Sequence, residues 1–408
     1  MSIEQATGLP SMDSPEYITN PQVFFSQEKC GGPVFQAVAA GGLKVWVVAG
    51  YAEARKALTD PRLSKNVDMA RRSILANLDR KANVMAFAVD LVSHMLNSDP
   101  PDHTRLRSLV NKAFTARASE RLRPSIESTT RKLLDGMAVH SETDLMEAFA
   151  HPLPMAVLCE LLGVPQPDRE RFDHWLSARM SNDPQRITMA APALLAYLRE
   201  LVDSKRRAPA DDLLSHLVQA QNSDGRLSPE ELVATTFLLL VAGHETTVHL
   251  IGAGMTSLLV HPDQLARLQR DRRLLPGAIE ELLRYDGPVK TATLRFTTEP
   301  VELAGTLIPA NSPVAIALAA ANRDETQFTA GDSFDITRPS VGHLAFGHGI
   351  HYCVGAPLAR LETDIAFTGL LDRFPYMQLL CDPSDLQWQP GMFRALASLP
   401  VRLQAPHR

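Results

Sequence analysis

The pattern of apolar and polar positions divides most of the chain into helical segments. Apolar residues recur at spacings of three and four, which is typical of helices that bury one face. The pattern predicts helices over residues 21–28, 51–59, 103–116, 119–137, 145–162, 168–177, 192–205, 213–221, 262–271, 275–285 and 356–374. Helices are therefore expected to form the bulk of the fold.

Short apolar and alternating runs predict a smaller β component. Residues 34–38 and 44–48 have the pattern of a hairpin joined across Gly41 and Gly42. Further strands are expected at 293–298, 301–303, 306–308 and 314–317, and in a tail over 377–403. The segment 66–97 has no clear period, and we expect an irregular connection there, which at this length is often functional.

One helix is expected to be much longer than the others. Ser228 has the position of an N-cap, Pro229 suits the first turn, and Glu231 completes a capping box. A helix from there to His261 would be about 45–50 Å long at 1.5 Å per residue. Because no segment resembles a linker, we expect one mainly α domain with minor β over residues 1–408.

Composition indicates an ordinary soluble protein. The 408 residues are 45% hydrophobic and 21% charged, and the net charge of −5 does not favour nucleic-acid binding. Residues 1–20 are polar, without the pattern of a signal peptide or an anchor. The apolar stretch 232–260 is interrupted by His244, Glu245 and His249, which argues against a membrane span. Four widely spaced cysteines fit free thiols in a reducing cytoplasm.

The most informative motif surrounds Cys353. The segment Phe346-Gly347-His348-Gly349-Ile350-His351-Tyr352-Cys353-Val354-Gly355 places a cysteine in a glycine-rich loop before a predicted helix. Helix N-terminal N–H groups stabilise a thiolate. The two loop glycines allow backbone conformations and close approaches that other residues avoid. The motif can therefore present a thiolate to a flat ligand.

A second motif lies midway along the long helix, at Ala242-Gly243-His244-Glu245-Thr246-Thr247. Gly243 permits close approach of a ligand, and the Thr246 hydroxyl can bond to a backbone carbonyl and bend the helix. His244 and His249 resemble a zinc-protease pair, but five residues turn the helix by about 500° and leave them about 140° apart. We therefore reject a zinc site shared by these two histidines.

Two further pairs share helix faces. Glu281 and Arg284 are three residues apart, and His103 and Arg107 are four apart. Taken alone, each pair fits a solvated helix surface. Arg107 also has the bidentate geometry that suits binding of a carboxylate.

Together these motifs resemble the cytochrome P-450 superfamily, whose cysteine loop has the form F-G-x-G-x-H-x-C-x-G. The resemblance implies a helix-rich triangular prism with small sheets that binds haem b, with Cys353 as axial iron ligand and Phe346, Gly347 and Gly355 beside the haem. It implies that His103, Arg107, Arg295 and His351 hold the haem propionates, that Glu245 and Thr246 relay protons during catalysis, and that Glu281 and Arg284 buttress the loop.

The resemblance also implies a reaction and its partners. A monooxygenase of this family inserts one atom of O2 into its substrate. Because the chain has no flavin or nicotinamide fingerprint, electrons from NAD(P)H are expected to arrive through a separate ferredoxin and ferredoxin reductase. We expect a cytoplasmic monomer.

The substrate is less well defined by the sequence. Residues expected to line its site are Met85, Val89, Leu239, Ala242, Val289, Leu294, Met392 and Phe393, which are apolar. The segment Ala304-Gly305-Thr306-Leu307-Ile308-Pro309-Ala310 resembles actinobacterial enzymes that tailor macrolides and other polyketides. We expect hydroxylation or epoxidation of such a molecule. Terpenoid or carrier-bound peptide hydroxylation, a peroxide-driven peroxygenase or fatty-acid hydroxylase, and a non-catalytic haem-thiolate binder stay open.

Overall fold

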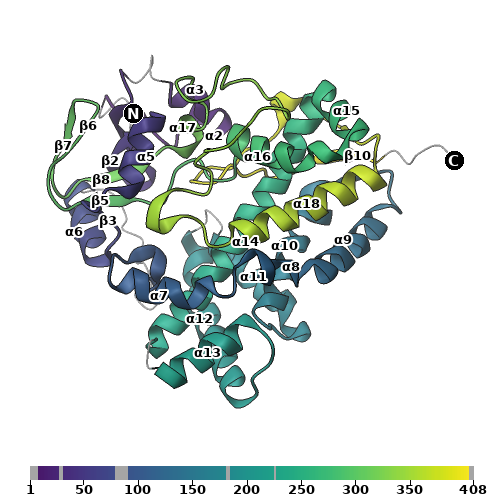
Figure 1. Ribbon diagram of the computed structural model, residues 1–408, viewed down its shortest axis with the longest axis horizontal. Helices are drawn as coiled ribbons and strands as arrows, with labels where there is room; N and C mark the ends of the chain where they lie inside the picture. The colour runs from purple at the N-terminus through teal and green to yellow at the C-terminus, as the bar shows by residue number, and fades with distance from the viewer. Residues whose placement is uncertain (1–7, 27–30, 79–90, 181–183, 225–226, 404–408) are drawn as a thin grey trace.

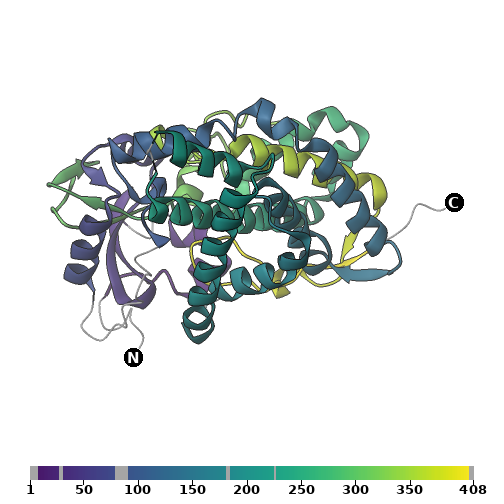
Figure 2. The same ribbon diagram turned by 90° about the horizontal axis from the view of Figure 1, so that it is seen from below.

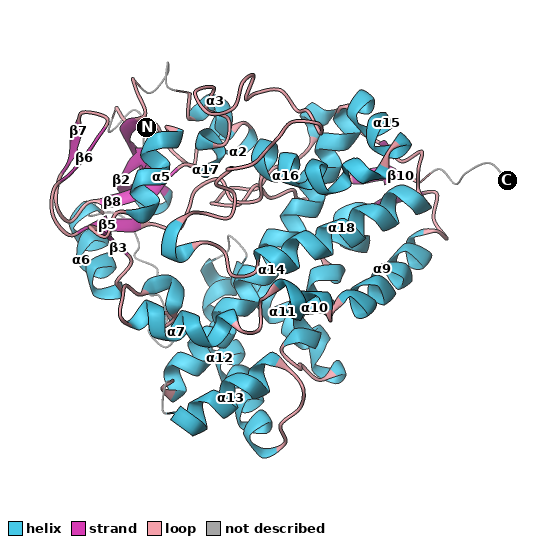
Figure 3. Cartoon of the chain, in the orientation of Figure 1, coloured by secondary structure: helices cyan, strands magenta, loops and turns pink. Residues whose placement is uncertain are grey.

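The computed structural model of the protein describes residues 8–26, 31–78, 91–180, 184–224 and 227–403. Helices dominate it, as predicted (Figure 3). The strands of the largest sheet gather at one corner of a roughly triangular outline, and the helices fill the rest (Figure 1). Seen from below, the same two regions lie side by side (Figure 2).

The largest sheet has five strands in the order β1-β2-β8-β5-β3. Its strands are β1 (Val34–Ala39), β2 (Leu43–Val48), β3 (Leu63–Ser64), β5 (Arg295–Thr297) and β8 (Pro313–Ile316). The predicted hairpin is confirmed, with Val34 opposite Val48, and β2 then pairs in parallel with β8. The sheet thus joins the N-terminal hairpin to the segment that leads toward the cysteine loop.

Two smaller sheets complete the β component. β4 (Glu142–Asp144), β10 (Pro400–Arg402) and β9 (Gln378–Leu379) form one, and β6 (Val301–Leu303) pairs with β7 (Thr306–Ile308) in the other. The predicted strands at 301–303 and 306–308 have the expected bounds. The C-terminal tail is mostly irregular between its two short strands.

The helices follow the predicted order. They are α2 (Pro15–Thr19), α3 (Pro21–Phe24), α5 (Tyr51–Thr59), α6 (Val67–Asn77), α7 (Asp102–Asn111), α8 (Ala116–Glu120), α9 (Arg123–Met137), α10 (Pro152–Leu161), α11 (Arg169–Met180), α12 (Pro184–Arg207), α13 (Leu213–Asp224), α14 (Pro229–Val260), α15 (Pro262–Arg270), α16 (Leu275–Asp286), α17 (Leu318–Ala321) and α18 (Ala356–Arg373).

Helix α14 is the central element. The Ser228 hydroxyl accepts a hydrogen bond from the Glu231 N–H, and the Glu231 carboxylate accepts one from the Ser228 N–H. The predicted capping box is therefore present. Among its neighbours are α10, α12, α16 and α18. The helix is long and apolar enough to cross a membrane, but 67% of its most apolar window is buried inside the protein. It is therefore a core helix.

The structure corrects three sequence expectations. Residues 67–77 of the segment expected to be irregular form α6, which Asn66 caps by accepting from the N–H groups of Asp68 and Met69. The helix predicted over 103–116 ends at Asn111, because Thr115 caps a new helix, α8. The helix predicted over 145–162 breaks into a π-helical turn, η4 (Met146–Ala150), before Pro152, which has no N–H to continue it.

Candidate functional site

The loop before α18 folds back on itself and presents Cys353. The Cys353 N–H donates to the Phe346 carbonyl over 2.8 Å, which closes the loop. Gly347 and Gly349 have φ angles of 72° and 75°, in the left-handed region that favours glycine. A Cβ at Gly349 would lie 2.9 Å from the Thr59 side chain on α5. The two glycines therefore set both the shape of the loop and its distance from α5.

The Cys353 side chain lies deep in the protein and is exposed to a cavity. Burial raises the pKa of its thiol, opposed by hydrogen bonds from the N–H groups of Gly355 and Ala356 and by the charge of Arg107. The net direction is upward. The loop therefore offers a partly stabilised sulfur, and a cation in the cavity would complete the stabilisation of its thiolate form.

The segment that leads into this loop is held by Glu281 and Arg284 of α16. Their side chains are 0% exposed and form two hydrogen bonds of 2.7 and 2.8 Å. Arg284 also donates to the carbonyls of Asn322 and Gly331. Glu281 accepts from the Ser340 hydroxyl over 2.6 Å and pairs with Arg338. We call these four side chains (Glu281, Arg284, Arg338 and Ser340) the Glu281 network.

A second set of charged groups lies beside the cavity. Burial lowers the pKa of His351, and the nearby charges of Lys65, His103, Arg295 and Arg107 lower it further. These five side chains come from the ends of β3, α7, β5 and the cysteine loop, and we call them the basic cluster. The structure thus brings together the four propionate-binding residues predicted from sequence.

The basic cluster is short of internal acceptors. His103 is 2% exposed, and neither of its ring nitrogens has a hydrogen-bond partner among the described residues. Its ring centroid lies 4.3 Å from that of His351. Burial lowers the pKa of Arg295 to about 10. A buried concentration of positive charge of this kind favours an anionic ligand.

Lys65 is the member that sequence reasoning missed. It is 4% exposed, its ammonium group donates to Thr293, and burial followed by the charge of Arg295 lowers its pKa to about 7. Asp99 bonds to its backbone N–H at 2.9 Å. No motif marks Lys65 in the sequence, because β3 has two residues and its position depends on pairing with β5.

Helix α14 forms the wall of the cavity across from the cysteine. The Thr246 hydroxyl donates to the Ala242 carbonyl over 2.7 Å, as predicted. Glu245 is buried. Although burial raises its pKa, the neighbouring His244 and His249 side chains hold it well below its usual range. Gly243 lets α14 approach Leu158, since a Cβ there would lie 2.7 Å from that side chain.

The cavity between α14 and Cys353 contains about 1150 Å³ of empty space, its mouth included. Its lining is mostly aliphatic and includes Leu239, Ala242 and Val289 from the predicted set, together with Phe346, Gly347 and Gly355. Leu294, Met392 and Phe393 are not among the residues that line it. Met85 and Val89 lie outside the described residues.

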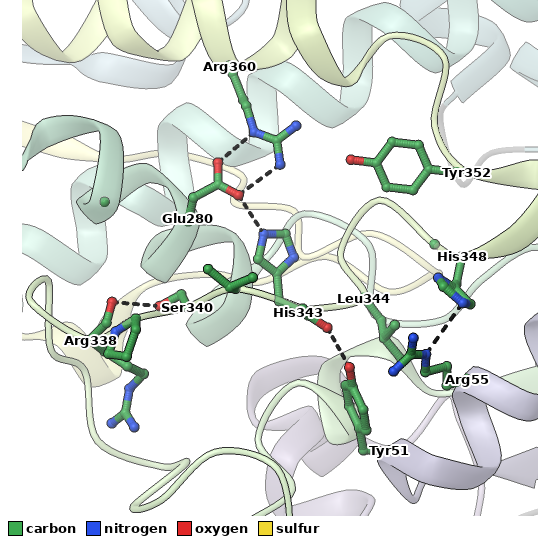
Figure 4. A pocket seen from close by; sticks show the side chains of 15 residues that line it. Tyr51, Arg55, Glu280, Arg338, Ser340, His343, Leu344, His348, Tyr352 and Arg360 are labelled. Carbon is green, nitrogen blue, oxygen red and sulfur yellow. Dashed lines mark hydrogen bonds and ion pairs between the residues drawn. The ribbon is translucent and has the colours of Figure 1, made fainter.

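The cysteine loop also borders a surface hollow (Figure 4). Glu280 lies there between Arg360 and His343, bonding to Arg360 at 2.6 and 2.8 Å and to His343 at 3.0 Å. Arg55 of α5 reaches His348 at 3.4 Å. Glu280 is the only acid among the residues that line the hollow, so its surface is predominantly basic.

Comparisons with known proteins agree with this geometry. The model of a family described as Cytochrome P450 matches residues 164–387. The chain is 49% identical to cytochrome P450 107B1 of Saccharopolyspora erythraea, covering 91% of this chain and 92% of that one. It is 42% identical to the 6-deoxyerythronolide B hydroxylase of the same organism, covering 97% and 99%.

A similar solved structure is the tirandamycin C-bound P450 monooxygenase TamI. It matches with a TM-score of 0.90 and 45% identity, covering 97% of this chain and 100% of that one. The likeness therefore extends over almost the whole chain, including both walls of the cavity.

Proposed function

Because the chain belongs to the cytochrome P450 family and is a P450 monooxygenase, we propose that it hydroxylates or epoxidises a large, mostly apolar macrolide or polyketide. The observation that carries this proposal is the aliphatic cavity between Cys353 and α14. The named substrate of one relative, 6-deoxyerythronolide B, and the tirandamycin C bound to another support this substrate class.

The residues present fit the haem that the family implies. When bound, haem supplies the oxygen-activating chemistry, which an axial thiolate favours. We propose that Cys353 would bind the haem iron through its sulfur, because that sulfur is exposed to the cavity and accepts hydrogen bonds from two N–H groups. Phe346, Gly347 and Gly355 would pack beside the ring, since each lines the same cavity.

The basic cluster fits the two carboxylates of haem. The unpartnered ring nitrogens of His103 and the buried guanidinium of Arg295 are suitable donors, with Arg107 and His351 beside them. A guanidinium can grip a carboxylate through two hydrogen bonds. Propionates would thus supply the acceptors that the described residues do not provide.

We assign proton transfer to Thr246 and Glu245. Thr246 lines the cavity and is directed at the Ala242 carbonyl, so its hydroxyl can exchange that partner for a water molecule at the reacting centre. Glu245 lies behind it, away from the lining, where its carboxylate can take up a proton and pass it on. The intact pair distinguishes this proposal from a peroxide-driven enzyme, which does not need protons delivered to O2 because peroxide already carries them.

We infer that an acidic ferredoxin, reduced by its reductase, docks on the face around the surface hollow. Arg55 lines this hollow and Lys56 is exposed next to it on α5, while α8, which packs against α18, carries the exposed Arg117. Opposite charge speeds encounter, and salt weakens that effect. The rate of reduction by ferredoxin should therefore fall as the salt concentration rises. This fall should be steeper for the wild-type protein than for Arg55→Glu.

The substrate assignment is tested by optical titration with macrolactones, linear polyketides, terpenoids, fatty acids and carrier-bound peptides. A macrolactone or polyketide should shift the haem spin state and, with ferredoxin, reductase and NAD(P)H, yield a product heavier by one oxygen atom. A shift with fatty acids alone would overturn the substrate class. Turnover with peroxide alone would indicate a peroxygenase, and a shift without product would indicate a binder.

A further inference from the structure

Three titratable side chains on α14, those of His244, Glu245 and His249, form a buried cluster. They have no role as a zinc site. The Glu245 carboxylate lies 3.3 Å from His244 Nδ1 and 3.1 Å from His249 Nε2. The two histidines are 1% and 5% exposed. The two histidines approach the carboxylate from different sides. They are too far apart around the helix to share a zinc ion, but both contact the glutamate that lies between them.

The hydrogen-bond directions restrict where protons can be. His244 Nε2 lies 3.3 Å from the carbonyl oxygen of His151, so this nitrogen must carry a proton to form a hydrogen bond. In a neutral His244, Nδ1 would then be a lone pair facing the Glu245 carboxylate. Two acceptors at that distance repel each other. A proton on Nδ1 would replace this repulsion with an ion pair, and Nδ1 has no other partner, since it is buried without a hydrogen bond among the described residues.

His249 has a different position in the cluster. As in His244, its Nδ1 is buried without a hydrogen-bond partner among the described residues, but this Nδ1 faces away from Glu245, which its Nε2 contacts, and its ring packs 5.8 Å from that of Phe393. A neutral His249 with its proton on Nε2 satisfies Glu245 without any added charge. His249 therefore fixes the carboxyl group, whereas His244 has the geometry to exchange a proton with it.

We propose that His244 and Glu245 share one proton and act as the proton store of this enzyme, with His249 as the residue that positions Glu245. This rests on the proposed function, because the store would serve the oxygen chemistry at Thr246. Because the two histidines hold Glu245 as a carboxylate, the stored proton rests on His244 Nδ1. On release, the Nδ1–H bond of His244 breaks, and Glu245 passes the proton to water on the Thr246 side and returns to its carboxylate form. A proton from solvent then restores the pair, and no electrons are transferred.

The first experiment measures the proton directly. In the haem-loaded ferrous–CO protein, which is diamagnetic, ¹⁵N-histidine NMR reports whether His244 Nδ1 carries a proton. We expect it to be protonated or in exchange with Glu245, and to become a lone pair in Glu245→Gln. An unprotonated Nδ1 in the wild type, or the same shift in both proteins, would overturn the proposal. This readout requires no substrate, so it is independent of the substrate assignment.

The second experiment separates storage from positioning. With any substrate that is turned over, His244→Gln should lower the product formed per NAD(P)H by roughly tenfold. This is less than the about 10²–10⁴-fold contribution of a direct acid–base catalyst, because His244 acts through Glu245. His249→Gln keeps a donor and should retain coupling, whereas His249→Leu should lose it several-fold. The exposed His216→Gln on α13 is the matched control.

The ferrous–CO spectrum shows whether each variant still folds around its haem. Wild-type coupling in a folded His244→Gln would contradict storage, and equal losses in His249→Gln and His249→Leu would contradict positioning. If no substrate is turned over by the wild type, the proposed function fails while the NMR result still decides this inference.

Discussion

The Glu281 network and the basic cluster both place charges in the protein interior, but their partners differ. Each charged group of the network has partners within the chain: Arg284 bonds to Glu281 and to backbone carbonyls, and Glu281 also accepts from Ser340. In the basic cluster, His103 has no partner among the described residues, and burial depresses the pKa of Arg295 and Lys65.

This difference separates a structural site from a binding site. A buried charge with all its hydrogen bonds satisfied stabilises the segment that supplies them. Buried donors without acceptors destabilise the chain until a ligand supplies the missing groups. We therefore expect changes in the network to act on folding and changes in the cluster to act on haem binding.

The largest effect is expected at Cys353, which follows the segment that the network holds and is close to Arg107 of the basic cluster. Cys353→Ala removes the proposed axial sulfur, so the ferrous–CO complex should lack the red-shifted thiolate Soret band and monooxygenase activity should disappear. Cys381→Ala, a half-buried cysteine outside the cavity, is the control and should leave both unchanged. Retention of the band in Cys353→Ala would remove this residue from the iron.

The next largest effect tests the Glu281 network. Glu281→Ala leaves Arg284 buried without its counter-ion, which typically costs about 3–5 kcal/mol of unfolding free energy. Ser340→Ala removes one hydrogen bond and should cost about 1 kcal/mol. Denaturant unfolding measures both.

The half-exposed pair of Arg272 and Asp372, 3.0 Å apart, provides the matched control for this change. Arg272→Ala should change the unfolding free energy by less than about 1 kcal/mol. Similar losses for Glu281→Ala and Arg272→Ala would show that the network does not support the fold.

A third change, in the basic cluster, should weaken haem binding and leave folding stability nearly unchanged. Arg295→Leu removes a desolvated charge, so we expect little loss of folding stability in the protein chain itself. Haem retention should weaken by roughly tenfold or more, because a hydrogen bond to a charged group contributes about 1.5–3 kcal/mol. The rate of haem transfer to a scavenging apoprotein measures this. Unchanged transfer together with a large loss of unfolding free energy would place Arg295 with the network instead.

The sequence predicted these two regions to different degrees. Glu281 and Arg284 were found because they share a helix face, and Cys353 because glycines and a helix start surround it. Their roles came from the family resemblance, since spacing alone also fits a solvated surface. Lys65 was missed because its burial arises from pairing between β3 and β5, which are more than 200 residues apart.

The secondary-structure errors have a similar origin. Helix α6 buries only Ser73, so its sequence lacks the apolar period that marks the other helices, although the Asn66 cap was a usable signal. The contacts of both His244 and His249 with Glu245 were also not predicted from the sequence. His244 and His249 lie far apart around the helix, as their spacing predicts, but the Glu245 side chain between them contacts both.

The smallest effect concerns Lys65 and pH. Its pKa of about 7 in the fold lies below the ordinary lysine value of 10.5, because burial and then the charge of Arg295 oppose its protonation. Below pH 7 both the folded and unfolded states bind the proton, and the cost of burying the charge is fully present. Between pH 7 and 10.5 the unfolded state binds more protons, so stability should rise with pH.

In protein prepared without haem, Lys65 should therefore contribute an increase of about 1 kcal/mol in unfolding free energy between pH 7 and pH 8, close to the limit of 1.36 kcal/mol per unit for one proton. Burial also lowers the pKa of Lys290 to about 7, so Lys290 should add a similar increase. Lys65→Met should therefore remove only the share that Lys65 contributes, whereas the exposed Lys56→Met should leave the whole increase. Bound propionates would hold Lys65 in its charged form, so the haem-loaded protein should show a flatter dependence. The same slope with and without haem would mean that Lys65 does not face the ligand, and the basic cluster would then consist of the four residues that the sequence predicted.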